Sequence, residues 1–166
     1  MIKKIVINII LLLTLQFTLN AKDINIDSLV QQAQKEHKHL FVWLHKDGCG
    51  YCENMREFTL ENDVVKAYIA KHFIYQHINV SKGDDVIYKG LTTTARKFAQ
   101  KLGYDFYPSS LFFNEKAEVV LADVGFMDGR KLSHEEKFYK ILNFIDAKRY
   151  KEIDFDEYKF TFDKEL

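Results

Sequence analysis

Cysteine is scarce in this chain. The 166 residues contain only two, and they stand three positions apart as Cys49 and Cys52. Two cysteines are too few for the disulfide framework that holds many small exported domains together. Stability must therefore come from a hydrophobic core, which a chain of this length with 47% hydrophobic residues is able to bury.

Proline is scarcer still, and an excess of charge is absent. Pro108 is the only proline, and no linker rich in proline or glycine divides the sequence. We therefore predict one domain over residues 22–166. The 24 lysines and arginines balance 24 aspartates and glutamates, so the formal net charge is zero. Without a basic patch to bind phosphates, nucleic acid is excluded as a partner class.

A long apolar run occurs only at the start of the chain. Residues 1–4 include two lysines, residues 5–19 are mostly apolar, and Ala21 offers a small residue for cleavage. This order is typical of a secretory signal peptide, and the run is shorter than the roughly 20 residues that span a bilayer. We expect residues 1–21 to direct export to the periplasm. Leu19 lies at the third position before the expected cleavage site, where a small residue is preferred. An uncleaved membrane anchor is therefore the alternative.

Hydrophobic periodicity predicts helices and strands that follow one another along the chain. Helices are expected over residues 27–38, from the cysteines to about residue 72 with a break near residues 61–63, over residues 92–102 and over residues 133–150. Strands are expected over residues 39–45, 73–80, 111–113 and 117–124. The run over residues 39–45 is almost continuously apolar, which favours a central strand buried on both faces. Asp27 or Ser28 is expected to cap the first helix, and Ser133 the last.

The tail over residues 151–166 alternates apolar and polar residues. It could form a strand that binds a partner, or a segment that lies on a membrane surface. Such a tail more often folds back and covers apolar surface. Packing on the domain is our prediction.

The chemistry is concentrated in Cys49-Gly50-Tyr51-Cys52, where a buried strand meets a helix. At a helix N-terminus, unpaired N–H groups and the helix dipole stabilise a thiolate. Thiol pKa values in such motifs fall from about 8.5 to between about 3.5 and 7.5. Cys52, one turn later, is close enough to attack a mixed disulfide. We therefore expect Cys49 to be the nucleophile and Cys52 the resolving thiol.

The cysteine pair has two alternative interpretations in which it is not catalytic. A purely structural disulfide would close a loop so short that it restrains the unfolded chain little. A zinc site needs four ligands, and His45 lies nearby without a second Cys-x-x-Cys or a histidine pair. Neither a metal nor a bound cofactor is predicted. Tyr51 is expected either to be exposed for contact with a partner or simply to fill the dipeptide.

Together with Tyr107-Pro108-Ser109 before an apolar strand, the motif resembles the thioredoxin superfamily over about residues 27–150. The resemblance implies a three-layer α/β/α thioredoxin fold with a central mixed sheet and an N-terminal helix. It also implies a cis Tyr107–Pro108 bond beside the thiols, with Tyr51, Tyr107 and Pro108 as substrate-binding residues. Without the resemblance, Pro108 would be a trans proline at the start of an edge strand.

The sequence departs from ordinary thioredoxin at two positions. Gly48 stands where that protein has a tryptophan, and Trp43 stands where it has a buried aspartate. The usual carboxylate that handles protons is therefore missing. His45, Lys46 and Asp47 are the candidates to replace it.

These features predict an exported thiol–disulfide oxidoreductase that acts on protein thiols or disulfides, as a reductase supplied with electrons by a membrane protein. A disulfide isomerase or oxidase is an alternative. The dipeptide Gly50-Tyr51 is similar to that of the periplasmic disulfide isomerases, but this chain has no room for their dimerisation domain.

A non-catalytic protein that binds copper or senses oxidant through the same thiols is the other alternative. Met55 is the sole nearby methionine, which argues against copper.

Overall fold

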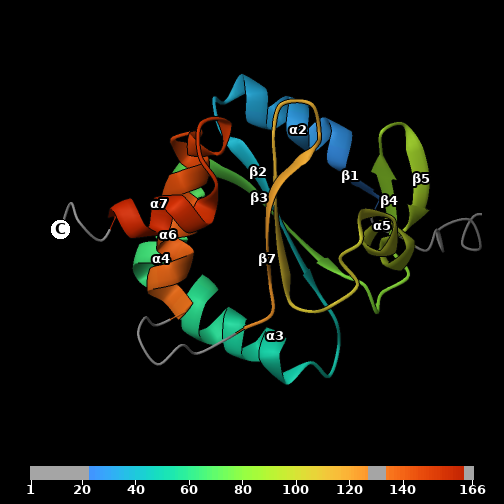
Figure 1. Ribbon diagram of the computed structural model, residues 1–166. Coiled ribbons are helices and arrows are strands. Elements are labelled where there is room, and N and C mark those ends of the chain that lie inside the picture. Colours follow the sequence, from blue (N-terminus) through green and yellow to red (C-terminus); the bar gives the residue numbers. More distant parts are fainter. Residues whose placement is uncertain (1–22, 127–133, 163–166) are drawn as a thin grey trace, which may run out of the picture.

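A computed structural model describes residues 23–126 and 134–162 (Figure 1). The predicted signal peptide and the predicted cap Ser133 lie outside these residues. The elements are β1 (Ile24–Asn25), α2 (Ile26–Lys35), β2 (His39–His45), α3 (Gly50–Met55), η2 (Arg56–Leu60), α4 (Asp63–His72), β3 (Phe73–Asn79), β4 (Asp85–Tyr88), β5 (Leu91–Thr94), α5 (Ala95–Leu102), β6 (Ser109–Phe113), β7 (Val119–Val124), α6 (His134–Asp146), η3 (Arg149–Lys151) and α7 (Phe155–Phe162).

The main sheet has four strands in the order β3-β2-β6-β7. Strand β3 runs parallel to β2, whereas β6 and β7 are antiparallel to their neighbours, so the sheet is mixed. Every residue from His39 to Leu44 is buried. The apolar run therefore forms the centre of the sheet, as its composition predicts.

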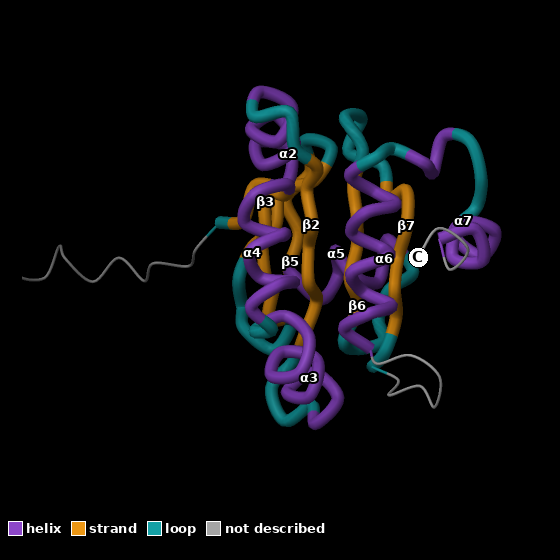
Figure 2. Tube along the Cα trace, turned by 90° about the vertical axis from the view of Figure 1, so that its left-hand side faces the viewer, coloured by secondary structure: helices purple, strands orange, loops and turns teal. Residues whose placement is uncertain are grey.

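Helices cover both faces of this sheet. Leu40, Val42 and Leu44 of β2 face the core beneath α2 and α5, whereas Phe41 and Trp43 face the core beneath α3, α4 and α6. Alternate residues of a strand point to opposite faces, which is why one strand supplies both cores. Figure 2 shows α4 and α6 side by side over the second face. The result is the three-layer arrangement that the resemblance implies.

A second, three-stranded sheet has the order β1-β4-β5 and was not predicted. The helix expected over residues 92–102 is wrong at its start, because residues 91–94 form β5 and pair with β4. Three consecutive threonines favour a strand, since their branched side chains suit a pleated surface. The helix α5 begins only after Thr94, whose side chain accepts a hydrogen bond from the Lys97 amide at 3.4 Å.

The predicted cap of the first helix is also wrong. Asn25 caps α2 by accepting a hydrogen bond from the Ser28 amide at 2.9 Å. The carboxylate of Asp27 instead accepts hydrogen bonds from the amides of Lys89 and Gly90, both at 2.8 Å. Asp27 therefore ties the β4–β5 turn to the first helix, a contact between residues far apart in sequence.

The long helix after the cysteines is interrupted where the sequence predicts a break. Residues 50–60 run from α3 into a π-helical turn, η2, and α4 starts at Asp63. The side chain of Asn62 caps α4 by accepting hydrogen bonds from the Val64 and Val65 amides. A π-helical turn widens a helix locally and is found frequently at functional sites.

Residues 155–162 of the tail form the helix α7, so the strand that its alternating pattern allows is not present in the described part of the tail. Phe155 and Tyr158 of α7 contact Phe144 of α6, with ring centroids 5.4 and 5.0 Å apart. In the part of the chain that the structure describes, no helix is long and apolar enough to cross a bilayer.

Candidate active site

Cys49 stands at the N-cap of α3, directly after the turn that ends β2. Its backbone is extended, and its sulfur accepts a hydrogen bond from the Cys52 amide at 3.2 Å. The preceding Gly48 has φ +66°, a left-handed conformation that glycine adopts without a steric penalty. Gly48 stands where ordinary thioredoxin has a tryptophan, and the conformation of this turn favours glycine at that position.

The two cysteines form a disulfide whose Cα atoms lie 5.2 Å apart, within the usual range. Cys49 is 7% exposed and Cys52 is 2% exposed. Both cysteines are therefore buried, and Cys49 is the slightly more exposed of the two.

The segment before β6 faces the first sulfur from the other side. The Tyr107–Pro108 peptide bond is cis, as the resemblance to the thioredoxin superfamily implies. The carbonyl oxygen of Tyr107 lies 3.7 Å from the sulfur of Cys49. The ladder between β6 and β2 begins only at Ser109, so the backbone of Tyr107 lies outside it, next to the cysteine pair.

Exposed aromatic side chains flank the cysteines. Tyr51, between the two thiols, is 65% exposed, and Phe106, directly before Tyr107, is 72% exposed. Aromatic residues are enriched at protein interaction sites. Lys46 also belongs to this rim, with its ammonium group 6.0 Å from the centre of the Tyr107 ring.

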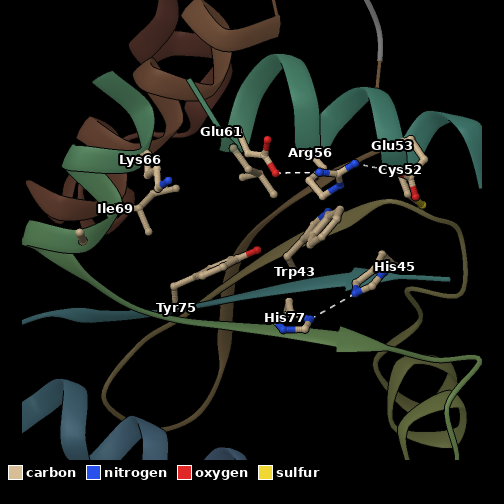
Figure 3. A pocket seen from close by; sticks show the side chains of 12 residues that line it. Trp43, His45, Cys52, Glu53, Arg56, Glu61, Lys66, Ile69, Tyr75 and His77 are labelled. Atoms are coloured by element: carbon tan, nitrogen blue, oxygen red, sulfur yellow. Dashed lines mark hydrogen bonds and ion pairs between the residues drawn. The ribbon is translucent and has the colours of Figure 1, made fainter. Parts of the chain in front are cut away.

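A cavity of about 560 Å³ lies on the opposite side of the disulfide, between the sheet and the helix above it (Figure 3). Its floor consists of side chains from the two parallel strands, Trp43 and His45 of β2 and Tyr75 and His77 of β3. Its roof includes Arg56, which is held between Glu53 at 2.8 Å and Glu61 at 2.7 Å. Cys52 lines one end.

The two histidines of this cavity contact each other. The Nε2 atom of His45 lies 3.3 Å from Nδ1 of His77, and the His45 ring stacks on Trp43 with centroids 4.4 Å apart. Burial, together with the nearby His77, lowers the pKa of His45 below its usual value. His45 therefore favours the neutral form, which is able to accept a proton.

Asp47 does not reach this cavity. Its carboxylate accepts a hydrogen bond from Asn79 at 2.7 Å and lies 3.5 Å from the ammonium group of Lys82. The hydrogen bond from Asn79 lowers the pKa of Asp47. Asp47 thus joins the β2–α3 turn to the loop after β3. Within residues 23–126 and 134–162, no group of three histidine, cysteine or acidic side chains is placed to hold a metal ion.

A model of the thioredoxin-like domain matches residues 26–140 of the sequence. The match spans well over half of the chain. The chain belongs to the thioredoxin-like family. With a disulfide-forming cysteine pair on this fold, this thioredoxin-like protein is a thiol–disulfide oxidoreductase.

Solved structures show the same fold. A thioredoxin-fold protein from Helicobacter pylori is 21% identical, with a TM-score of 0.62 over 84% of this chain and 82% of that one. A thioredoxin from Thermus thermophilus is 19% identical, with a TM-score of 0.54 over 76% and 88%. The C-terminal domain of DsbD from Neisseria meningitidis is 17% identical, with a TM-score of 0.51 over 71% and 91%. A search of the curated proteins finds no match.

Sequence reasoning missed the second histidine of the site in this thioredoxin-like protein. The alternation in β3 places Tyr75 and His77 on one face, but only the parallel register brings Trp43 opposite His77. His45 follows Trp43 by two residues on that same face, which places the two imidazoles diagonally. The alternation of residues 73–77 was the available signal, but it does not show which strand lies beside them.

Proposed function

We propose that this protein reduces disulfide bonds in exported proteins. Cys49 attacks one sulfur of the partner's disulfide and releases the other as a thiolate. Cys52 then attacks the sulfur of Cys49, releases the second partner thiol, and leaves the Cys49–Cys52 disulfide. Two electrons pass to the partner, and a membrane electron-donor protein is expected to restore the dithiol.

The observation that carries this proposal is the position of Cys49 at the N-cap of α3. A thiolate there accepts a hydrogen bond from the Cys52 amide and lies at the positive end of the helix dipole. Both interactions stabilise the charged form. The difference in burial supports the division of roles. Cys49 at 7% exposure is the sulfur nearer the partner, and Cys52 at 2% exposure is protected from it.

The substrate platform is proposed to consist of Tyr51, Tyr107 and Pro108. Tyr51 supplies exposed aromatic surface, and the Tyr107 carbonyl lies beside the reactive sulfur. A partner strand that hydrogen-bonds to the backbone of Tyr107 would place its own cysteine next to Cys49. Backbone pairing of this kind depends little on side chains, so it suits an enzyme that accepts many partners.

The direction of electron flow is tested by the reduction potential of the Cys49–Cys52 couple. We expect a value nearer the roughly −270 mV of thioredoxin than the roughly −120 mV of the oxidant DsbA. The measurement is equilibration with dithiothreitol buffers, followed by alkylation of free thiols. A Cys52→Ser variant is the control, because it has no intramolecular couple. A value near −180 mV would favour an isomerase, and one near −120 mV an oxidase.

Export to the periplasm is the second part of the proposal. The basic, apolar and small order of residues 1–21 supports it. Mass spectrometry of the protein purified from its host cell is expected to find the mature N-terminus at or near Lys22. An intact Met1 on a membrane-bound protein would instead identify an uncleaved anchor, and an intact Met1 on a cytosolic protein would contradict export.

A further inference from the structure

The second step of the reaction needs a proton acceptor. Only the thiolate form of Cys52 attacks the mixed disulfide, and burial in apolar surroundings disfavours that form. Cys52 is 2% exposed, so its thiol has little direct contact with bulk water. The residue at the position of the usual buried carboxylate is Trp43, which has no acidic group. The candidates for a proton acceptor are therefore the groups that line the cavity beside Cys52.

The cavity contains a graded path from the thiol to solvent. Cys52 is buried at one end, His45 is half-buried on the floor, and His77 is exposed on the outer strand of the main sheet. Figure 3 shows the two imidazoles next to each other on the paired strands, with Cys52 on the helix above them. The 3.3 Å contact between them is short enough for one imidazole to pass a proton to the other.

The surroundings leave His45 free to change its protonation state. Arg56 is already paired with Glu53 and Glu61 on the roof, and Asp47 is held by Asn79. The remaining titratable groups of the lining are Lys66 and Tyr75, from α4 and β3. The electrostatic influences on His45 from Asp47 and Glu53 favour its charged form, whereas burial and His77 oppose it. An intermediate balance of this kind suits a group that gains and loses a proton in each cycle.

The cavity is large enough to connect the thiol with the imidazole through water. Its volume is about 560 Å³, and Cys52, Trp43 and His45 all line it. A cavity of this size with several polar side chains has ample room for water. Water in it would connect the Cys52 thiol with His45, whose ring is held against Trp43 by stacking.

We propose that His45 and His77 form a proton relay for Cys52, a role that rests on the proposed function. The Cys52 S–H proton passes through cavity water to neutral His45, and His45 passes a proton on to His77 and solvent. The resulting thiolate attacks the sulfur of Cys49, and the partner's sulfur leaves with the electron pair of the broken S–S bond. A proton from solvent then neutralises the departing thiolate, so protons and electrons balance.

The relay is tested with the reduced full chain and an aromatic disulfide, Ellman's reagent, in a stopped-flow spectrometer. Attack of Cys49 on the reagent releases the first coloured thiolate, at a rate that depends on the reagent concentration. Attack of Cys52 on the mixed disulfide releases the second, at a rate that does not depend on it. We expect His45→Gln to slow the second release at neutral pH by at least about tenfold, in line with the loss of a general base. The first release should change little.

The pH dependence separates a relay from a structural role. The second release should speed up as pH rises through the pKa of His45. Removing His77 removes an influence that lowers this pKa, so His77→Gln should move the midpoint to higher pH. Free imidazole should accelerate the second release of His45→Ala, because the cavity has room for it. Lys66→Met, at the cavity wall on α4, is the matched control and should behave like the wild type.

The possible outcomes are distinct. Wild-type rates and an unchanged pH profile for the second release in both glutamine variants would overturn the relay and leave the proposed function standing. A slow second release in His45→Ala that imidazole does not accelerate would also overturn it. A wild-type protein that releases only one equivalent would contradict the resolving role of Cys52 and remove the relay with it.

Discussion

Replacing Cys49 with serine is expected to abolish disulfide reduction, down to the rate of the uncatalysed background. The hydroxyl of serine is not ionised at neutral pH and does not form a mixed disulfide, so the first step has no nucleophile. The measurement is reduction of a protein disulfide with dithiothreitol as the electron source. No other cysteine in the sequence can take over, because Cys52 is the only one left and is 2% exposed.

Cys52→Ser is expected to lose turnover in a different way. Its Cys49 still attacks, but the mixed disulfide with the partner persists because the resolving thiol is absent. Non-reducing gel electrophoresis should show a covalent complex of the variant with its partner, and dithiothreitol should separate the two by reducing the mixed disulfide. Thermal unfolding of both variants in the reduced state serves as the control for folding. Full turnover by Cys52→Ser would show that Cys52 is not the resolving thiol. A covalent complex formed by Cys49→Ser would show that the two roles are reversed.

Phe112→Ala is expected to cause the largest loss of stability, about 3–5 kcal/mol in the free energy of unfolding. Phe112 is fully buried on β6, where it stacks on Phe41 with centroids 4.8 Å apart and meets Phe73 edge-on at 5.9 Å. It also contacts Phe138 of α6. Truncation would leave a cavity where the sheet meets the helix layer, and typical domains have only about 5–15 kcal/mol to lose.

A matched control is available for this substitution. Phe58→Ala removes the same atoms from a side chain that is 53% exposed on the π-helical turn. Denaturant unfolding should show little change for Phe58→Ala and a much lower midpoint for Phe112→Ala. Equal losses for the two variants would contradict the placement of the aromatic core between β6 and α6.

Neighbouring residues were enough to predict the centre of the sheet and the start of the active-site helix. The apolar run over residues 39–45 buries both faces of β2, because a strand with no polar face has no side to expose. The spacing of Cys49 and Cys52 places both sulfurs on the first helical turn, whatever the rest of the chain does. The break before α4 follows from Asn62, which caps the next helix through its own side chain.

Features that depend on which segments pair were not predictable in the same way. Residues 91–94 follow a helical pattern with the segment after them, yet pairing with β4 makes them a strand. Asp27 looks like a helix cap, but the β4–β5 turn folds against it and takes its hydrogen bonds. In the first case pairing with the neighbouring strand overrides the helical pattern, and in the second Asp27 bonds to an amide 62 residues away.

By itself, the sequence determined that this protein carries a Cys-x-x-Cys pair at a helix start, with a lone proline ahead of a later strand. These are local features, since backbone geometry over a few residues sets them. Only the tertiary structure decided that Tyr107 lies against Cys49 and that His45 meets His77 beside Cys52. Such contacts depend on which strands pair and in what register. A shift of one residue between β2 and β3 would turn His77 to the opposite face of the sheet and separate the two imidazoles.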